Sequence, residues 1–235
     1  MEGSQPTERN ASTARRRGPK MWYRYVLELL VIIVGIMVSF LLNEWRQSIR
    51  DRDKEQRLLH DLHADLRQDS IAIQDELADL ERIMHSSQRL HAHPVRNVPL
   101  DSVVAVLGPV LSYSIIPFHQ VTYREMLATG DAELLRDDQL LRDIMELYER
   151  HYFMIRELGE IDERIVLDRM FPVSNRTVLF EQPDTASMNT LMRDVEWRNL
   201  LNLSMFFKSR IIEDLKEQLD RIDRIMRRIE KEMEE

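Results

Sequence analysis

The sequence predicts an all-α protein: an N-terminal transmembrane helix that continues into a long helix of an elongated antiparallel helical bundle with a C-terminal heptad segment. Three observations predict this fold class. Charged residues make up 31% of the 235 residues, whereas glycine occurs six times, a composition that favours long polar helices. An apolar run lies near the N-terminus, and no glycine or proline occurs between Gly35 and Pro94. Apolar residues recur at heptad spacing near the C-terminus.

Charge and cysteine content exclude several classes of protein. The chain has no cysteine, which excludes disulfide frameworks, thiolate metal sites and cysteine nucleophiles. Residues 1–24 carry six basic and two acidic side chains, although the whole chain has a formal net charge of -8. The remainder is therefore strongly acidic, and an acidic body argues against a nucleic-acid partner, which would need clustered Lys and Arg.

Residues 1–20 are predicted to be a disordered basic tail, because they contain almost no apolar side chains. Residues 21–45 are predicted to be the membrane anchor. Every residue from Tyr25 to Leu42 is apolar or small except Glu28, and about 18 helical residues span roughly 27 Å, close to the thickness of a hydrocarbon core. Trp22 and Trp45 mark the two interfaces. A buried core helix and a cleaved signal peptide are the alternatives, but the run ends without a small-x-small cleavage site.

The orientation of the anchor depends on the basic residues at its two ends. Because an arginine-rich tail is hard to translocate, we expect the N-terminus in the bacterial cytoplasm and the body outside the inner membrane. The count is close, since basic residues also follow the span at Arg46, Arg50, Arg52, Lys54 and Arg57.

Three residues within the anchor are candidate contact sites. Glu28 lies about one turn inside the span, where a carboxylate is costly and is a candidate for function. The alternative is that Glu28 reaches the interface and pairs with Arg24, four residues earlier. Gly35 and Ser39 form a small-xxx-small pair that would let two anchors approach closely.

The body, residues 46–235, is predicted to contain five helices, at about 46–92, 101–116, 122–129, 138–170 and 192–234, with a loop over 171–190. Thr122 and Glu125 have the spacing of a capping box, and Gly130 is expected to end that helix. Asp137 or Asp138 is expected to cap the next helix, and Pro172 to end it.

The last helix contains a seam of apolar residues that alternate steps of three and four. This spacing is typical of the a and d positions of a coiled coil. The seam has two interpretations, packing within the bundle, which we favour, and a coiled coil between two chains. Its residues are Ile212, Leu215, Leu219, Ile222, Met226, Ile229 and Met233.

Histidines were considered as metal ligands. His60-x-x-His63 and the pair His91 and His93 have spacings that occur in metal sites, but the carboxylates that a helical bundle site needs do not recur on other helices. His119 and His151 lack the company of a catalytic triad. Phosphate-binding loops, nucleophile elbows and zinc-protease motifs are missing from the sequence. We therefore expect no catalytic, cofactor-binding or metal site.

Two stretches resemble a family of bacterial single-pass membrane proteins of unknown function. Tyr25-x-x-Glu28, the glycine-containing span to Leu42, and Asn43-x-Trp45 resemble the start of its members, although Leu42 stands where they have a first Asn. The stretch from Thr122 to Gly130 resembles their Thr-Tyr-x-Glu-Leu-x-x-Ser-Gly motif, and the leucine-rich segment that follows, up to Tyr148, fits as well. The resemblance implies a membrane-bound helical protein, gives weight to Glu28, Asn43 and Trp45, and implies no activity.

Three functions remain open at this point. We favour a non-enzymatic interaction or scaffold protein that contacts the lipid bilayer and either a second copy of itself or another membrane or envelope protein. The second is a sensory or ligand-binding module, and the third is a subunit that contacts its complex through Glu28. For the second, core packing is the alternative role of the residues that would line a pocket: Tyr148, Tyr152, Phe153, Met154, Trp197, Met205, Phe206 and Phe207.

Overall fold

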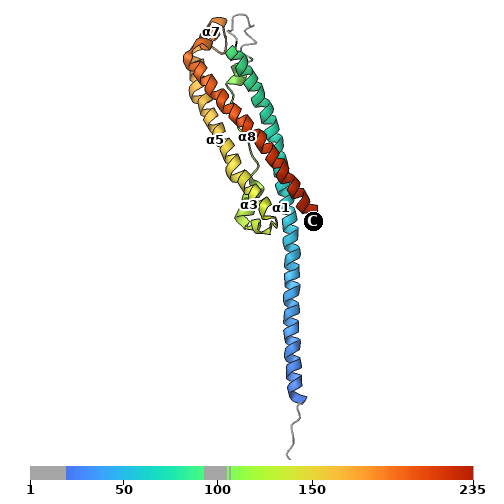
Figure 1. Ribbon diagram of the computed structural model, residues 1–235. Coiled ribbons are helices and arrows are strands. Elements are labelled where there is room, and N and C mark those ends of the chain that lie inside the picture. The colour runs from blue at the N-terminus through green and yellow to red at the C-terminus, as the bar shows by residue number, and fades with distance from the viewer. Residues whose placement is uncertain (1–19, 93–104, 106, 235) are drawn as a thin grey trace, which may run out of the picture. The chain divides into compact units, whose positions relative to one another are not determined.

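The computed structural model describes residues 20–92, 105 and 107–234 (Figure 1). The predicted all-α fold class is confirmed, because the described residues form helices and contain no strand. The chain divides into two compact units, residues 1–51 and 52–235, which are described separately. The helices are α1 (Lys20–Ala92), α3 (Val121–Thr129), η1 (Asp131–Leu134), α4 (Asp138–Glu146), η2 (Leu147–His151), α5 (Tyr152–Arg164), η3 (Ile165–Met170), α6 (Phe171–Thr177), α7 (Thr185–Arg193) and α8 (Val195–Glu234).

The first unit contains the N-terminal part of α1. The side chains from Trp22 to Arg50 are exposed on every face of the helix, including the whole apolar run. Among the described residues, α1 is the one helix whose length and composition are sufficient to cross a membrane. The predicted basic tail, residues 1–20, lies almost entirely outside the described residues.

The second unit is a bundle of three long helical columns. The columns are α1 from Arg52 onward, the unbroken helical stretch from Asp138 to Thr177, and α8. Contacts between side chains set their directions. Asp69 on α1 contacts Tyr152, whereas Asp162 on α5 contacts Ser204 and Asp143 contacts Arg228. The last two contacts show that α8 runs antiparallel to the stretch from Asp138 to Thr177. Since α8 is also antiparallel to α1, which it meets through His63 with Glu230 and Glu81 with Lys216, the first two columns are parallel.

Two parallel helices need a connection that travels back along the bundle. Residues 112–120 provide it as an extended segment, which we call the strap. The strap lies close against α5, because a Cβ added at Gly159 would meet the carbonyl oxygen of Ser114 at 3.1 Å. Phe118 of the strap stacks on Tyr152, with ring centroids 3.8 Å apart. The strap is therefore a packed part of the bundle.

Apolar side chains of this unit form two separate cores. The larger one, the main core, contains Leu62, Leu66, Ile144, Ile211 and Ile222 with their neighbours. The smaller one, the distal core, is built by the second half of the Asp138–Thr177 column, α7 and the start of α8. Its buried members are Leu90, Leu107, Val110, Leu111, Ile165, Val166, Met170, Val173, Val178, Met188, Leu191, Trp197, Leu200 and Leu201.

Three predicted elements are corrected by the structure. The helix expected over 101–116 is helical in its described part only to 110, and no helix resumes before α3 at Val121. Pro172 does not end its helix: it lies in α6 directly after the π-helical segment η3, and the helical stretch continues through it to Thr177. The loop expected over 171–190 therefore contains α6 and α7.

The capping box at Thr122 and Glu125 is also wrong. Helix α3 begins at Val121 after Gln120, and no side chain of its own caps it. Instead the backbone N–H of Thr122 donates to Asp65 of α1, at 3.3 Å. The predicted end of this helix is confirmed, because Gly130 has φ 79°, the left-handed conformation that glycine adopts without strain.

Candidate functional site

The predicted contact residues of the anchor all lie on the exposed surface of α1. Glu28, Asn43 and Trp45 are exposed there. The Ser39 hydroxyl donates to the carbonyl oxygen of Gly35 at 2.9 Å, so this hydroxyl is satisfied within its own helix. Among the described residues, no atom lies within 4 Å of a Cβ added at Gly35. These two small residues form the floor of an open groove whose walls include Ile32 and Phe40.

The heptad seam of α8 lies in the bundle's own core. Leu215, Ile222 and Ile229 are fully buried in the main core. The other four predicted residues, Ile212, Leu219, Met226 and Met233, are partly buried and pack against it. The centre of the buried stripe is displaced by one position from the predicted seam. Ile211, Gln218 and Ile225 are buried, whereas the predicted seam contains the next residue in each case, at 212, 219 and 226.

Four described histidines, His60, His63, His119 and His151, contact carboxylates or amides rather than one another. His60 lies 3.4 Å from Asp61, and His63 lies 3.1 Å from Glu230 of α8. Nδ1 of His151 is 3.4 Å from the side-chain nitrogen of Gln218. Within the described ranges, no group of three or more His, Asp or Glu side chains could hold a metal ion. The side chains of His91 and His93 lie outside the described residues.

The most concentrated polar contacts of the body surround Asp69 of α1. This carboxylate is completely buried and accepts hydrogen bonds from two other segments. The backbone N–H of His119 donates to one Asp69 carboxylate oxygen at 2.7 Å, and the Nδ1 atom of the His119 imidazole lies 2.9 Å from the same oxygen. The Tyr152 hydroxyl donates to the second carboxylate oxygen at 2.7 Å. Asp69 thereby joins α1, the strap and α5 at one point.

Aromatic rings complete this cluster. Tyr148 and Tyr152 meet edge to face, with centroids 5.2 Å apart, and Tyr123 of α3 stacks on Tyr148 at 4.4 Å. The Tyr123 hydroxyl donates to Glu149 at 3.0 Å. The Tyr148 hydroxyl is buried without a hydrogen-bond partner among the described residues. We call Asp69, His119, Tyr123, Tyr148 and Tyr152 the Asp69 cluster.

Burial determines the protonation of the Asp69 cluster. Loss of solvent raises the pKa of Asp69, and this effect outweighs the hydrogen bonds from His119 and Tyr152, which lower it. Burial and the charge of Asp69 raise the pKa of Tyr152 well above its ordinary value, so its hydroxyl keeps its proton and donates. Since Asp69 is completely buried, the carboxylate fixes the strap and does not face a solvent-accessible substrate.

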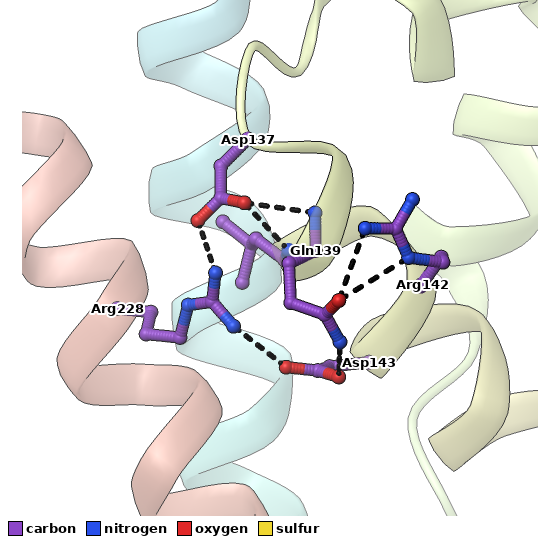
Figure 2. A network of polar contacts seen from close by, with 6 residues as sticks. Asp137, Gln139, Arg142, Asp143 and Arg228 are labelled. Carbon is purple, nitrogen blue, oxygen red and sulfur yellow. Dashed lines mark hydrogen bonds and ion pairs between the residues drawn. The ribbon is translucent and has the colours of Figure 1, made fainter.

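A second polar network joins the C-terminal part of α8 to the start of α4 (Figure 2). Asp137 is the N-cap of α4, confirming one of the two predicted residues, and it accepts from the backbone N–H groups of Gln139 and Leu140. Arg228 of α8 bridges this cap and Asp143, with distances of 2.5 and 2.9 Å. Partial burial raises the pKa of Asp137, but the Leu140, Arg228 and Gln139 hydrogen bonds outweigh it and lower the pKa.

The aromatic and methionine residues considered as a pocket lining do not gather in one place. Tyr148 and Tyr152 belong to the main core, whereas Trp197 belongs to the distal core, with Met205 and Phe207 packed against it. The other three, Phe153, Met154 and Phe206, are exposed. A cavity of about 240 Å³ lies beside the strap, lined by Ser114, Ile115, Ile116, Phe118, Ile155, Arg156, Gly159, Glu160 and Glu163.

The buried charged residues of the body were not predicted from the sequence. Asp69, Asp162 and Lys208 are at most 1% exposed, although charged side chains are normally assigned to the surface. A signal for them was present, because each is in phase with an apolar stripe. Asp69 falls between Leu66 and Ile73, and Lys208 falls between Leu201 and Leu215, at heptad spacing.

Comparison with known proteins found no relative of this chain: no family model, no curated protein and no solved structure matches it.

Proposed function

We propose that this chain is a single-pass protein of the bacterial inner membrane whose helical body is a non-enzymatic interaction module outside the cytoplasm. The observation that carries the proposal is the apolar run of α1, which is exposed on all faces of its helix. Large exposed apolar surfaces mark contacts with lipid or with protein. A bilayer covers every face of a helix at once, and the length of the run fits its hydrocarbon core.

The aromatic residues at the two ends of the run support the same interpretation. Trp22, Tyr23 and Tyr25 lie at one end and Trp45 at the other, all of them exposed. Trp and Tyr are enriched at both interfaces of membranes, where one side of the ring is apolar and the other is wet. The proposed orientation, with the N-terminus in the cytoplasm, rests on the basic residues before the span.

The body is assigned to interaction because of where its polar groups are used. Its buried carboxylates connect helices to one another, as Asp69 and Asp162 do. The partly exposed Arg228 also joins α8 to α4. Exposed apolar side chains such as Val121 and Phe206 provide points of contact for another protein.

Membrane insertion is tested by introducing arginine into the middle of the apolar run. Fractionated membranes are washed with alkaline carbonate, and the wild-type chain is expected in the pellet. Replacing Ile33 and Met37 with Arg costs about 3 kcal/mol for each residue at the bilayer centre, so this variant should move to the supernatant. The matched control replaces Ile71 and Phe206, two exposed apolar residues of the body, with Arg and should stay in the pellet. Wild-type protein in the supernatant would overturn the proposal.

Orientation and interaction are tested in cells. A phosphatase that is active only outside the cytoplasm is fused after Glu235, and activity is expected. A photo-crosslinking residue at Phe206 or Val121 should give adducts with another protein or with a second copy, whereas the same residue at Glu217, an exposed polar position, serves as the control. Monomer alone at all three positions counts against an interaction module.

A further inference from the structure

Buried polar residues separate the two cores of the body. On α1 the main core extends to Ile83 and the distal core begins at Leu90, with buried Ser87 between them. On the strap and the residues before it, buried Ser114 separates Leu111 from Ile116.

The same change occurs on the other two columns. On α5, Asp162 lies between Ile155 of the main core and Ile165 of the distal core. On α8, Ser204 and Lys208 lie between Leu201 and Ile211. All four segments therefore change core at a buried polar residue. We call the set the polar boundary: Ser87, Ser114, Asp162, Ser204 and Lys208.

The centre of the polar boundary is a closed group of three side chains. The Lys208 ammonium donates to Asp162 at 2.5 Å and to the Ser204 hydroxyl at 2.8 Å. The Ser204 hydroxyl in turn donates to the other oxygen of Asp162 at 2.8 Å. Lys208 is 1% exposed and Asp162 is completely buried. Burying such a pair adds little stability compared with apolar residues of the same volume, but it does fix one relative position of two helices.

The distal core is held together by shorter pieces than the main core. It includes residues of α6 and α7, of seven and nine residues, and of the π-helical segment η3. The Nε1 atom of Trp197, its largest buried side chain, has no hydrogen-bond partner among the described residues, and an unpaired buried donor lowers stability.

We propose that the distal core opens and closes while the main core stays folded, and that the group of Asp162, Ser204 and Lys208 sets this boundary and returns α8 to its position against α5. Apolar packing carries cooperativity from one part of a protein to the next, and the polar boundary interrupts that packing. Local opening of this kind occurs as one cooperative unit with a lower free energy than global unfolding. In the open state the apolar side chains around Trp197 become accessible to solvent.

The proposal is tested by hydrogen exchange of the full chain in detergent micelles, followed by mass spectrometry over a series of low urea concentrations. Peptides from 185–201 should be protected at least roughly tenfold less than peptides from 59–83. They should also lose protection at urea concentrations that leave 211–229 unchanged. Equal protection and the same urea dependence in all three regions would overturn the proposal.

A variant then tests the role of the buried group. Asp162→Leu, Ser204→Ala and Lys208→Met together replace it with apolar side chains, and the protection of 185–201 should approach that of 59–83. The matched control is Glu81→Leu with Lys216→Met, which removes an exposed ion pair of 2.8 Å between α1 and α8 and should leave the difference unchanged. If the triple variant folds and the difference persists, the buried group does not set the boundary. If it does not fold, the wild-type exchange pattern still decides whether the distal core opens separately.

Discussion

Single buried carboxylates have large effects in this bundle because each joins several segments. Asp69 holds the strap through His119 and holds α5 through Tyr152. Removing a partner from such a site leaves a buried polar group without its hydrogen bond, which costs about 1–3 kcal/mol. The Tyr148 hydroxyl already lacks a partner among the described residues, and the cluster therefore contains one group that is destabilising where it stands.

The raised pKa of Asp69 leads to a prediction about pH. Because the folded pKa lies above the ordinary 3.8, the folded chain binds this proton before the unfolded chain does. The contribution of Asp69 to stability should therefore increase as the pH falls through the folded pKa, and should be complete below 3.8. The Asp69→Asn variant lacks this gain. Urea unfolding from pH 7 to pH 4 should show the wild type gaining stability relative to the variant.

The control for this prediction is Asp75→Asn, which removes an exposed carboxylate of the same helix. His119, Asp65, Tyr148 and Tyr152 are the other titratable groups that face Asp69, and all four remain in both the wild type and the Asp69→Asn variant. A wild type that loses stability relative to Asp69→Asn as the pH falls would contradict the assigned direction of the pKa shift.

At the scale of the element, some helix ends are set by neighbouring residues and one by a side chain that is distant in the sequence. Asp137 was predictable as a cap, because it directly precedes α4 and its side chain accepts from the backbone N–H groups of Gln139 and Leu140. The start of α3 was not predictable, since Asp65 of α1 supplies its acceptor from 57 residues away. Pro172 was misleading because the sequence around a proline does not show whether the helix ends there or continues, as it does here directly after the π-helical segment η3.

The cap of α4 gives a prediction for stability. Replacing Asp137 with Ala removes the side-chain acceptor of two backbone N–H groups, those of Gln139 and Leu140, and leaves Arg228 with one carboxylate. The loss should therefore be about 1 kcal/mol or more. The matched control is Asp184→Ala, which caps α7 through the same two contacts without an arginine and should cost less. Thermal or urea unfolding measures both. Equal losses would indicate that Arg228 adds nothing to the cap.

The same cap responds to pH in the opposite direction to Asp69. The pKa of Asp137 is lowered in the folded chain, so its contribution to stability is present above 3.8 and is lost as the pH falls through its folded pKa. The stability of the wild type relative to Asp137→Ala should therefore decrease below pH 3.8. A constant difference across this range would contradict it.

At the scale of the whole molecule, sequence periodicity predicted the three long helical columns but not α6, α7 or the division of the body into two cores. The spacing of Leu62, Leu66, Leu77 and Leu80 shows one continuous apolar stripe, and the fold class follows from it. The separation into two cores depends on which polar residues interrupt the stripes on four segments at once. Pairings such as Asp162 with Lys208 join residues 46 positions apart, and no local pattern specifies them.

The division of the chain into residues 1–51 and 52–235 gives a further prediction. A fragment from Arg52 to Glu235 retains both cores and lacks the exposed apolar run, so it should be helical and monodisperse without detergent. Circular dichroism and light scattering after gel filtration measure this. The matched control begins at Lys20, retains the apolar run, and should require detergent. Aggregation of the shorter fragment in plain buffer would show that the body depends on the anchor for its folding.

The strap limits which insertions and deletions this protein tolerates between its first two columns. An extended segment advances about 3.3 Å for each residue, whereas a helix advances 1.5 Å, so one residue lost from 112–120 leaves α3 short by more than two helical positions. One added residue can bulge outward beside the exposed Ile115. Deleting Tyr113 should therefore lower the melting temperature far more than inserting a glycine there. The segment acts as a ruler that tolerates lengthening and resists shortening.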